Sequence, residues 1–532
     1  MRSLALVGCL LGCNGGGPGS LELTLSLPTK MELRPAGMTT VTVTATAPGE
    51  SPISNTSAIG DDNRFTAGEF PIGEDVQLGV VLRDVSNRIV GVGEAGQTID
   101  IVGDKATAIS IPVRRPFVYA ASGANLYSFD PTLDPRAAGF QGKVMGVSNP
   151  QVMVSVGGDR VAVISSTSVQ IMLTADNTLA GSIPIPGAVT VTDATAVPGT
   201  QMIVVAHTGG MAIVDVAAGS IQMINVGPID RVTAGRSVNG ALFAYGLTGR
   251  VLPPEKAERL ATCTGTSSIV TISLDAPATA PPVSVGVAIS DIAAAPDQGM
   301  LFATLPCTGK VVRITGDLEL GSLSLTDVAS LERAAVLTVA GDRVFAAGTK
   351  MSRPVCTPGT DEASCTTTTQ IACPHPNGGN RLRWVTDGAS LLVQSIPLSG
   401  IDAITLNVPG RRETIIDTGD MAEQHAQVLK TFGVVPLDLV ALPGGQYVGL
   451  ATKSRYYVED GGLELPCLDV TTGDWLLVDM ASSAVALRVR TSCTGMVGAS
   501  LFPWICEAPP DGQQRAFESY IPTSVGALFG AR

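Results

Sequence analysis

The sequence predicts an all-β protein in which an N-terminal β-sandwich is followed by a β-propeller of about seven blades. Two observations carry this prediction: apolar and polar residues alternate strictly from Leu21 onward, and a short motif recurs at intervals through residues 117–500. Hydrophobic residues make up 45% of the 532 residues and charged residues only 15%. This composition excludes a disordered chain, which combines low hydrophobicity with high net charge. The formal charge of −13 argues against nucleic-acid binding, which needs a basic face.

The first twelve residues have the features of a secretion signal. Arg2 supplies a positive charge, and residues 3–12 form a continuous apolar stretch of suitable length. The stretch ends at the sequence Leu-Leu-Gly-Cys, with Cys13 as its last residue, and a glycine-rich run follows to Ser20. An earlier candidate cysteine, Cys9, leaves too short an apolar stretch before it. An ordinary cleaved signal with two incidental cysteines is the alternative.

This N-terminal arrangement resembles the lipobox of bacterial lipoproteins, in which the signal is cut before a cysteine that becomes lipid-modified. The resemblance implies that residues 1–12 are removed and that acyl chains on Cys13 anchor the chain to the lipid bilayer. Residues 13–20 are then a lipidated cysteine and a flexible tether. We therefore expect a protein of the cell envelope, anchored in the outer membrane and either periplasmic or surface-exposed.

The other cysteines are consistent with export. Eight remain beyond Cys13, and an even number in an exported chain indicates disulfides, with 105 possible connectivities. One pairing is argued from the residues: Cys467 and Cys493 flank, almost symmetrically, two apparent strands at 475–479 and 485–489. The candidates are Cys263, Cys307, Cys356, Cys365, Cys373, Cys467, Cys493 and Cys506.

Residues 21–113 are expected to form the β-sandwich. Leu21, Leu23 and Leu25 alternate with polar residues, and residues 41–46 repeat the pattern. Six or seven short strands in this span, without helical periodicity, are typical of an immunoglobulin-like sandwich. The sequence Arg114-Arg115-Pro116 marks the expected boundary.

Residues 117–500 contain the repeat. In three copies an aspartate precedes a proline by five residues and leads into two short strands joined by a tight turn; the aspartates are Asp193, Asp291 and Asp438. Four short antiparallel strands every 40–50 residues form one propeller blade. Residues 291–314, and next 193–215, resemble the repeats of YVTN-type propellers, a resemblance that implies the fold and says little about a ligand.

Two segments interrupt the repeat, and a third follows it. Residues 350–381, rich in Cys, Thr, Pro and Gly, are interpreted as an inserted loop pinned by disulfides. Residues 420–432 have an apolar stripe at helical spacing, which predicts a helix. The C-terminal tail, residues 501–532, has no clear pattern.

The chain offers few residues for acid–base catalysis. It has three histidines, His207, His375 and His425, and no motif of a triad hydrolase, a phosphate loop or a zinc protease. His207 lies between an apolar strand and a Gly-Gly pair and is interpreted as a turn residue. His375 with three cysteines (Cys356, Cys365 and Cys373) forms a conceivable zinc site, but the spacings of nine and eight residues favour disulfides. We expect no catalytic residues, no metal and no cofactor.

The repeated aspartates allow two interpretations. Each begins what should be the innermost strand of a blade, so Asp193, Asp291 and Asp438 would ring one mouth of the central channel and attract a cation or a basic peptide. Alternatively, each accepts hydrogen bonds from backbone N–H groups in a turn. The favoured hypothesis is a non-enzymatic binding or assembly scaffold with other envelope proteins as partners. The alternative is a propeller enzyme, lactonase-like or quinone-dependent dehydrogenase-like, that uses the channel rim.

Overall fold

A computed structural model describes the chain from Gly19 onward, with gaps. The expected signal and Cys13 lie outside the described residues. The gaps before residue 350 are 48–52, 61–63, 71, 104, 123, 131, 134–140, 158–159, 174–175, 188, 238, 254–262, 296–298 and 318–321. After residue 350 the structure describes 370–374, 380–384, 390–398, 403–409, 412–416, 426–442, 447–460, 469–480, 484–495 and 524–527. No helix among these residues is long and apolar enough to cross a membrane.

The N-terminal unit is one curled sheet of eight strands in the order β3-β2-β5-β6-β8-β1-β4, with β7 paired to β5. Its two edge strands approach each other, and the Ser57 hydroxyl of β3 donates a hydrogen bond to the Thr66 carbonyl of β4. A short 3-10 helix, η1 (Met31–Leu33), follows β1. The strands are β1 (Gly19–Ser26), β2 (Thr40–Thr46), β3 (Ile53–Ala58), β4 (Arg64–Phe70), β5 (Gly73–Arg83), β6 (Ile89–Glu94), β7 (Ile99–Ile101) and β8 (Ala106–Arg114).

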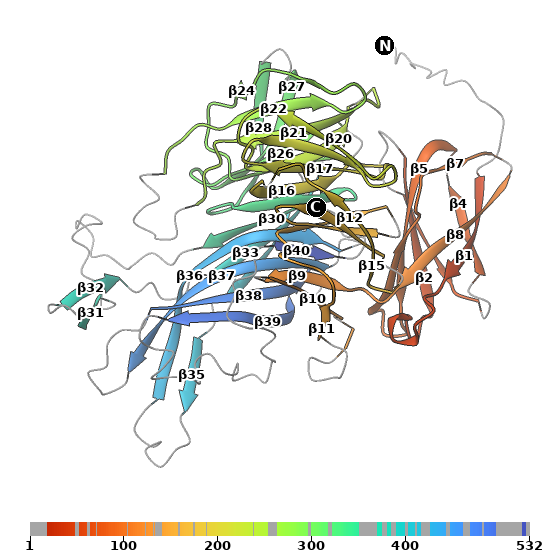
Figure 1. The fold of residues 1–532 in the computed structure, drawn as a ribbon. Coiled ribbons are helices and arrows are strands. Elements are labelled where there is room, and N and C mark those ends of the chain that lie inside the picture. Colours follow the sequence, from red (N-terminus) through yellow and green to blue (C-terminus); the bar gives the residue numbers. More distant parts are fainter. Residues whose placement is uncertain are drawn as a thin grey trace, which may run out of the picture.

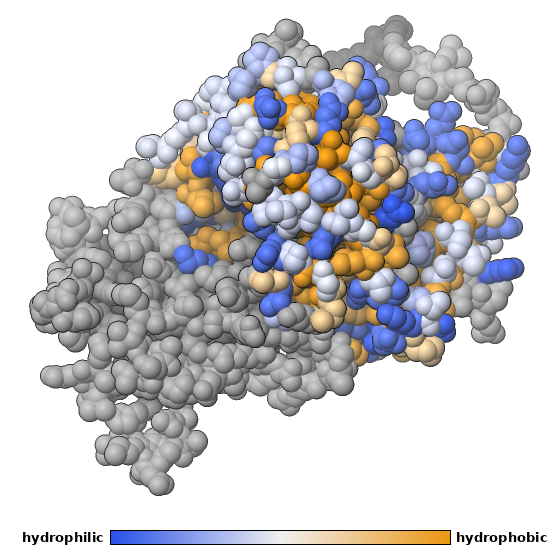
Figure 2. Space-filling view, viewed as in Figure 1, coloured by the Kyte–Doolittle hydropathy of each residue, from blue (hydrophilic) through white to orange (hydrophobic). Residues whose placement is uncertain are grey.

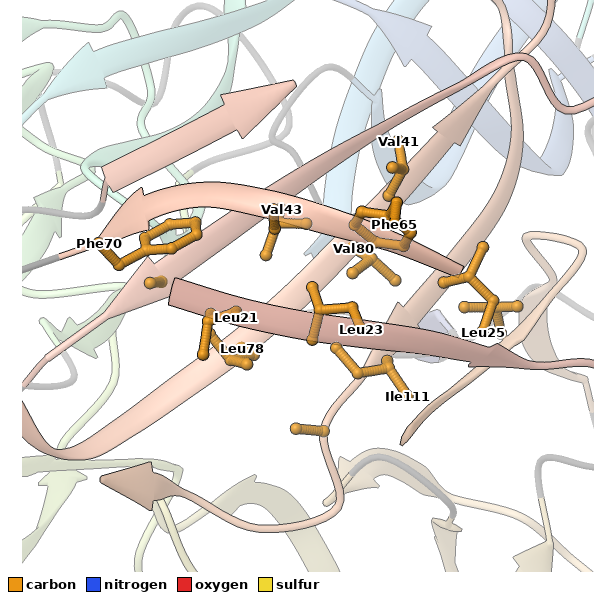
Figure 3. Packing of buried hydrophobic residues seen from close by; sticks show 14 of the residues in the cluster. Leu21, Leu23, Leu25, Val41, Val43, Phe65, Phe70, Leu78, Val80 and Ile111 are labelled. Carbon is orange, nitrogen blue, oxygen red and sulfur yellow. The ribbon is translucent and has the colours of Figure 1, made fainter. Parts of the chain in front are cut away.

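The alternation seen in the sequence explains how this sheet encloses a core. Leu21, Leu23 and Leu25 of β1 point inward, where they meet apolar side chains from β2, β4, β5 and β8 (Figure 3). The polar residues between them point outward, as the two-residue period of a strand requires. The all-β character expected for this unit is confirmed. The strands form one nearly closed sheet. This strand order does not establish the finer prediction of an immunoglobulin-like topology.

The rest of the described chain forms a β-propeller, as predicted. Blade 1 is made of β9 (Val118–Ser122), β10 (Asn125–Phe129), β11 (Gln141–Val144) and β40 (Ser524–Ala527). Blade 2 is made of β12 (Val152–Val156), β13 (Arg160–Ile164), β14 (Ser168–Leu173) and β15 (Thr178–Pro184), and blade 3 of β16 (Val191–Ala196), β17 (Met202–His207), β18 (Gly210–Asp215) and β19 (Ser220–Asn225).

Blades 4 and 5 are equally regular. Blade 4 is made of β20 (Arg231–Arg236), β21 (Leu242–Thr248), β22 (Ser268–Ser273), β23 (Ala278–Thr279) and β24 (Val283–Ser284). Blade 5 is made of β25 (Asp291–Ala294), β26 (Leu301–Leu305), β27 (Lys310–Asp317) and β28 (Ser322–Ser330).

Blades 6 and 7 carry additions. Blade 6 is made of β29 (Val336–Ala340), β30 (Arg343–Lys350), β33 (Ser390–Pro397) and β34 (Ile404–Pro409), and the expected insertion contains a small hairpin of β31 (Gln370–Pro374) and β32 (Asn380–Trp384). Blade 7 is made of β36 (Ala426–Ala441), β37 (Tyr447–Asp460), β38 (Asp469–Asp479) and β39 (Ala484–Gly495), with β35 (Arg412–Ile416) at its edge. The helix predicted over 420–432 is wrong from Ala426 onward, where the chain is strand β36.

The innermost strands close a ring. Among the described strands, β12, β16, β20, β25, β29, β36 and β40 each contact the next, and β40 contacts β12. Six of these blades are each built from one continuous stretch of chain. Blade 1 combines both ends of the propeller chain, because the C-terminal strand β40 pairs with β9 as its innermost strand. Phe129 of blade 1 stacks on Trp475 of blade 7, with ring centroids 5.2 Å apart, so the junction that closes the ring also has an apolar layer.

The two ends of the ring differ. At one end the first strand of each blade turns into the second, and we call it the docked end because the N-terminal sheet contacts it. Gly157 and Gly199 occupy two of these turns with positive φ, and a Cβ on either would lie 3.5 Å from an atom of the β6–β7 loop. At the opposite end, the far end, the second strand of each blade turns into the third. The N-terminal sheet and the β31–β32 hairpin lie on opposite sides of the propeller (Figure 1).

The boundary expected at residues 114–116 is a packed junction at the docked end. One apolar cluster joins Leu33, Val81 and Ile89 of the N-terminal unit to residues of blades 1 and 2. Arg114 is buried, lies over the Phe117 ring and donates to the Asn177 side-chain oxygen at 3.3 Å. The N-terminal sheet is therefore seated on the propeller by a shared core.

Candidate functional site

The three repeated aspartates lie on innermost strands of blades 3, 5 and 7. Asp193 is in β16, Asp291 begins β25 and Asp438 is in β36, each close to the far end of the ring. All three are buried, with 4–6% of their surface exposed. Their positions on the inner strands follow from the repeat, since each aspartate stands five residues before its proline.

Arg231, at the start of the inner strand of blade 4, lies between these carboxylates. Its Nη1 donates to an Asp193 oxygen at 3.3 Å, and its Nε lies 3.5 Å from an Asp291 oxygen. Its Nη2 donates to the Leu437 carbonyl, beside Asp438, at 3.1 Å. One guanidinium thus connects the inner strands of blades 3, 4, 5 and 7.

The carboxylates also bind backbone groups of the neighbouring blade. Asp193 accepts the Val232 N–H of β20 at 3.0 Å, and Asp291 accepts the Leu337 N–H of β29 at 3.0 Å. Asp438 accepts the N–H of the next residue, Leu439, at 3.0 Å. Side-chain oxygens that hold N–H groups across a blade boundary fix the spacing of the ring, as a capping residue fixes a helix end.

Opposing effects set the charge states in this cluster. Burial works to lower the pKa of Arg231, but the carboxylates of Asp291, Asp193 and Asp438 outweigh it, and the pKa lies above the ordinary arginine value. Burial raises the pKa of Asp291, although Arg231, Arg250 and the Leu337 N–H oppose the rise. Arg231 is therefore a fully charged cation, held by at least two carboxylates.

Arg250 is the second arginine near this cluster. It follows the second strand of blade 4 and is partly exposed at the far end. Its Nε donates to the Ser290 carbonyl at 2.7 Å, and its backbone N–H donates to Asp230 at 2.9 Å. Burial and the nearby charge of Arg231 lower the pKa of Arg250 to about 10, although the three carboxylates oppose the fall.

A cation of the chain itself, Arg231, occupies the place that the cation-site interpretation of the three aspartates would give to a bound cation. Arg231 already occupies the space between Asp193 and Asp291, and backbone N–H groups take further carboxylate oxygens. In the part of the chain that the structure describes, no group of three or more His, Cys, Asp or Glu residues is arranged to hold a metal ion. The alternative, that the aspartates accept backbone N–H bonds, describes the geometry better, although two of those bonds cross between blades.

His207 ends strand β17 and is buried, with 2% of its surface exposed. Its Nδ1 accepts the Gly209 N–H at 3.0 Å, which fits the expected turn residue, and burial lowers its pKa. His375 and His425, together with Cys356 and Cys365, lie outside the described residues, as does Cys506. The structure describes only the backbone of Cys373, so the zinc and disulfide alternatives for that insertion stay predictions.

One disulfide is present among the described residues. Cys263 and Cys307 are bonded, with Cα atoms 5.3 Å apart. Cys263 lies between the second and third strands of blade 4, and Cys307 lies between those of blade 5. The bond therefore joins loops of adjacent blades at the far end. Sequence spacing left this pairing among many possible ones.

The Cys467–Cys493 pairing stays a prediction. Cys467 lies outside the described residues, and Cys493 is in β39, paired with Thr472 of β38. Thr472 is five positions from Cys467, and two irregularities in the β38–β39 register displace the strands from the symmetric arrangement assumed in the prediction.

Sequence analysis assigned no role to Arg231. A signal was present, because an arginine at the start of a mostly apolar inner strand of a charge-poor chain requires a counter-charge when it is buried.

Comparisons with known proteins leave the function open. No protein-family model and no curated protein matches the sequence. Three similar solved structures are hydrazine synthase of Kuenenia stuttgartiensis (13% identity, 64% of this chain and 95% of that chain covered, TM-score 0.35), a functionally unknown protein of Desulfotomaculum acetoxidans (11%, 65% and 96%, 0.37) and a chain of a nidogen/laminin complex (8%, 70% and 98%, 0.32). Likenesses this remote carry no argument about activity.

Proposed function

We propose that this protein is a lipid-anchored scaffold of the cell envelope that binds partner proteins through its propeller. The acylated Cys13 would hold it to the outer membrane, and the N-terminal sheet would separate the bilayer from the propeller. The observation that carries the proposal is the use of the ring carboxylates. Asp193 and Asp291 hold Arg231 and neighbouring backbone N–H groups, so the ring stabilises itself with groups that an enzyme would direct at a substrate.

The direction of β1 supports the spacer role of the N-terminal unit. Strands β1 and β8 are parallel, with Ser20 beside Ala106 and Ser26 beside Pro112. Because β8 ends at the propeller junction, β1 begins at the opposite end of the strand pair, about 20 Å away at roughly 3.3 Å per residue. A tether that leaves from Gly19 therefore starts away from the junction.

The anchor is tested with the full chain and a Cys13→Ala variant, labelled with a radioactive fatty acid. We expect the label on the native chain only, and the variant in the soluble fraction. A Cys9→Ala variant is the matched control and should keep the label if the signal is cut before Cys13. Label retained by the Cys13→Ala variant would contradict the lipid anchor.

The scaffold role is tested separately, by cross-linking in intact envelopes and recovery through a tag placed after Arg532. We expect specific partner proteins that are absent when an unrelated lipoprotein carries the tag. The enzyme alternative predicts instead turnover of lactones or of alcohols with a quinone, and such turnover by the purified chain would overturn the scaffold proposal.

A further inference from the structure

The outermost strand of each blade pairs on one side only, so its other edge carries unpaired backbone N–H and C=O groups. Proteins ordinarily protect such an edge with a proline, a charged side chain, a β-bulge or a very short strand, or by covering it. Figure 2 shows hydrophobic residues lying among hydrophilic ones on the visible propeller surface, so hydrophobicity alone does not single out one edge. The backbone pattern of the edges, in contrast, differs between blades.

The edges of blades 1, 2 and 4 are protected in these ways. Strand β11 of blade 1 has only four residues. Strand β15 of blade 2 ends in Pro184, and its register with β14 is irregular. Blade 4 divides its edge into the two-residue strands β23 and β24, with Pro281 and Pro282 between them. Each of these edges is therefore a poor template for a further strand.

The edges of blades 5, 6 and 7 are protected as well. Strand β28 of blade 5 has an irregular register with β27, and its Asp327 forms an ion pair with Lys310. Strand β34 of blade 6 ends in Pro409 and contacts β39 of blade 7. Strand β39 has two irregularities in its own register with β38.

Strand β19 of blade 3 has none of these features. Its six residues, Ser220–Asn225, include no proline, glycine or charged residue, and they pair with β18 without any irregularity. Among the described strands, β19 pairs with β18 alone. Because successive residues of an antiparallel strand alternate between its two edges, every second residue directs its N–H and C=O groups away from β18. Ser220, Gln222 and Asn225 are exposed, so this edge is open to solvent.

We propose that β19 binds an extended segment of a partner protein, which adds a fifth strand to blade 3. The proposal rests on the binding role proposed above and adds the surface and the mode of recognition. In such strand addition the main-chain hydrogen bonds supply affinity, and alternate side chains of the added strand supply specificity.

The side chains of β19 indicate the composition of the added segment. Ile221 and Met223 pack on the apolar cluster that blades 2 and 3 share, and Ile224, on the opposite face, packs on the cluster that blades 3 and 4 share. An added strand would lie beside these side chains, so apolar residues at alternate positions suit it. The chain's net charge of −13 favours a basic segment and disfavours a second copy, which would carry the same charge.

The test uses the detergent-solubilised full chain and a fluorescent peptide of alternating valine and lysine. A counterpart with prolines at two central positions has the same charge but cannot complete the strand pairing. We expect the native chain to bind the first peptide at least about tenfold more tightly than the second, because main-chain hydrogen bonds are lost. Hydrogen exchange of β19 amides should slow with the first peptide. Equal binding of both peptides, or slowed exchange in other strands in place of β19, would overturn the proposal.

A pair of lysine substitutions tests whether the edge of blade 3 is the site. Gln222→Lys places a charge opposite the lysines of the added peptide and should weaken binding about threefold or more. Ser182→Lys adds the same charge at an exposed position of β15, the edge of the neighbouring blade, and should leave binding unchanged. Equal effects of the two substitutions would show that overall charge, and not β19, governs binding.

Two proline substitutions test the main-chain hydrogen bonds. Gln222 and Met223 are neighbours, so one directs its N–H group towards β18 and the other directs it outward. Proline is tolerated in an edge strand where the N–H group faces solvent. Of Gln222→Pro and Met223→Pro, we therefore expect one to keep the native unfolding temperature and to bind the peptide about tenfold more weakly. The other should unfold at a lower temperature. Native binding by the stable variant would contradict strand addition.

Two further outcomes separate this proposal from the scaffold role. A dimer in analytical sedimentation that Gln222→Lys abolishes, without peptide binding, would assign the edge to a second copy and overturn the proposal. Recovery of cross-linked partner proteins that the stable proline variant leaves unchanged would keep the scaffold role and exclude β19 from it.

Discussion

The two ends of the propeller bury an arginine in opposite ways. Arg114 at the docked end and Arg231 near the far end are both almost inaccessible, with 2% and 5% of their surface exposed. Arg114 is met by an amide oxygen and an aromatic ring, and burial lowers its pKa. Arg231 is met by carboxylates, which raise its pKa in spite of burial. Arg114 thus contacts neutral groups, although the charges of Asp130 and Asp176 also act on it, whereas Arg231 contacts carboxylates directly.

This difference can be tested by making the same substitution at both ends. Arg231→Met would leave Asp193 and Asp291 buried without their cation, and loss of one partner from a buried ion pair costs about 3–5 kcal/mol. Arg114→Met keeps an apolar stem against Phe117 and loses a long hydrogen bond, so we expect about 1–2 kcal/mol. Urea unfolding at pH 7 measures both. Equal losses would contradict the comparison.

The Cys263–Cys307 disulfide adds a covalent link between two blades at the far end. Cys263 and Cys307 are 44 residues apart, and closing a loop of that size is worth about 2–4 kcal/mol in the chain-entropy view. We expect Cys263→Ser and Cys307→Ser to destabilise by similar amounts, and the double variant by little more than either. Additive losses in denaturant unfolding would show that the two thiols act separately.

The smallest expected effect concerns Glu94, which ends β6 just before the loop that meets the docked end. Burial raises its pKa to about 7, although Gln77 donates to it at 2.8 Å and opposes the rise. Because the folded chain holds this proton more tightly than the unfolded chain, the associated stability is present below pH 4.5 and is lost as the pH rises through about 7. This contribution is at most about 3 kcal/mol, and partial exposure of the side chain reduces it.

Glu94→Gln keeps the shape of the side chain and removes the titration. We expect the variant to be more stable than the native chain at pH 8, with a flatter stability profile between pH 5 and pH 8. Thermal unfolding across this range measures the change, and Glu22→Gln on an outward-facing position of β1 is the matched control. An unchanged slope in the Glu94 variant would show that Glu94 does not titrate there.

Much of the architecture could be predicted from local sequence. The inner strands of blades 3, 5 and 7 were located from an aspartate five residues before a proline, because each blade repeats the same turn. Residues 426–432 were predicted as helix but belong to strand β36. A short apolar run fits both the helical and the strand period, and only its pairing with β37 decides between them. Arg231 was missed for a related reason: its partners come from other blades, and a single sequence does not show which strands meet.

Blade 1, which combines strands from both ends of the propeller chain, also sets the order in which the fold can be completed. Strand β9 is among the first parts of the propeller to leave the ribosome, and its inner partner β40 follows more than 390 residues later. Blades 2–6 can pair their strands as they emerge, but blade 1 stays incomplete until β40 (Ser524–Ala527) has been made. A chain interrupted before Ser524 therefore exposes an unpaired strand edge, a feature that favours aggregation and marks unfinished copies for removal.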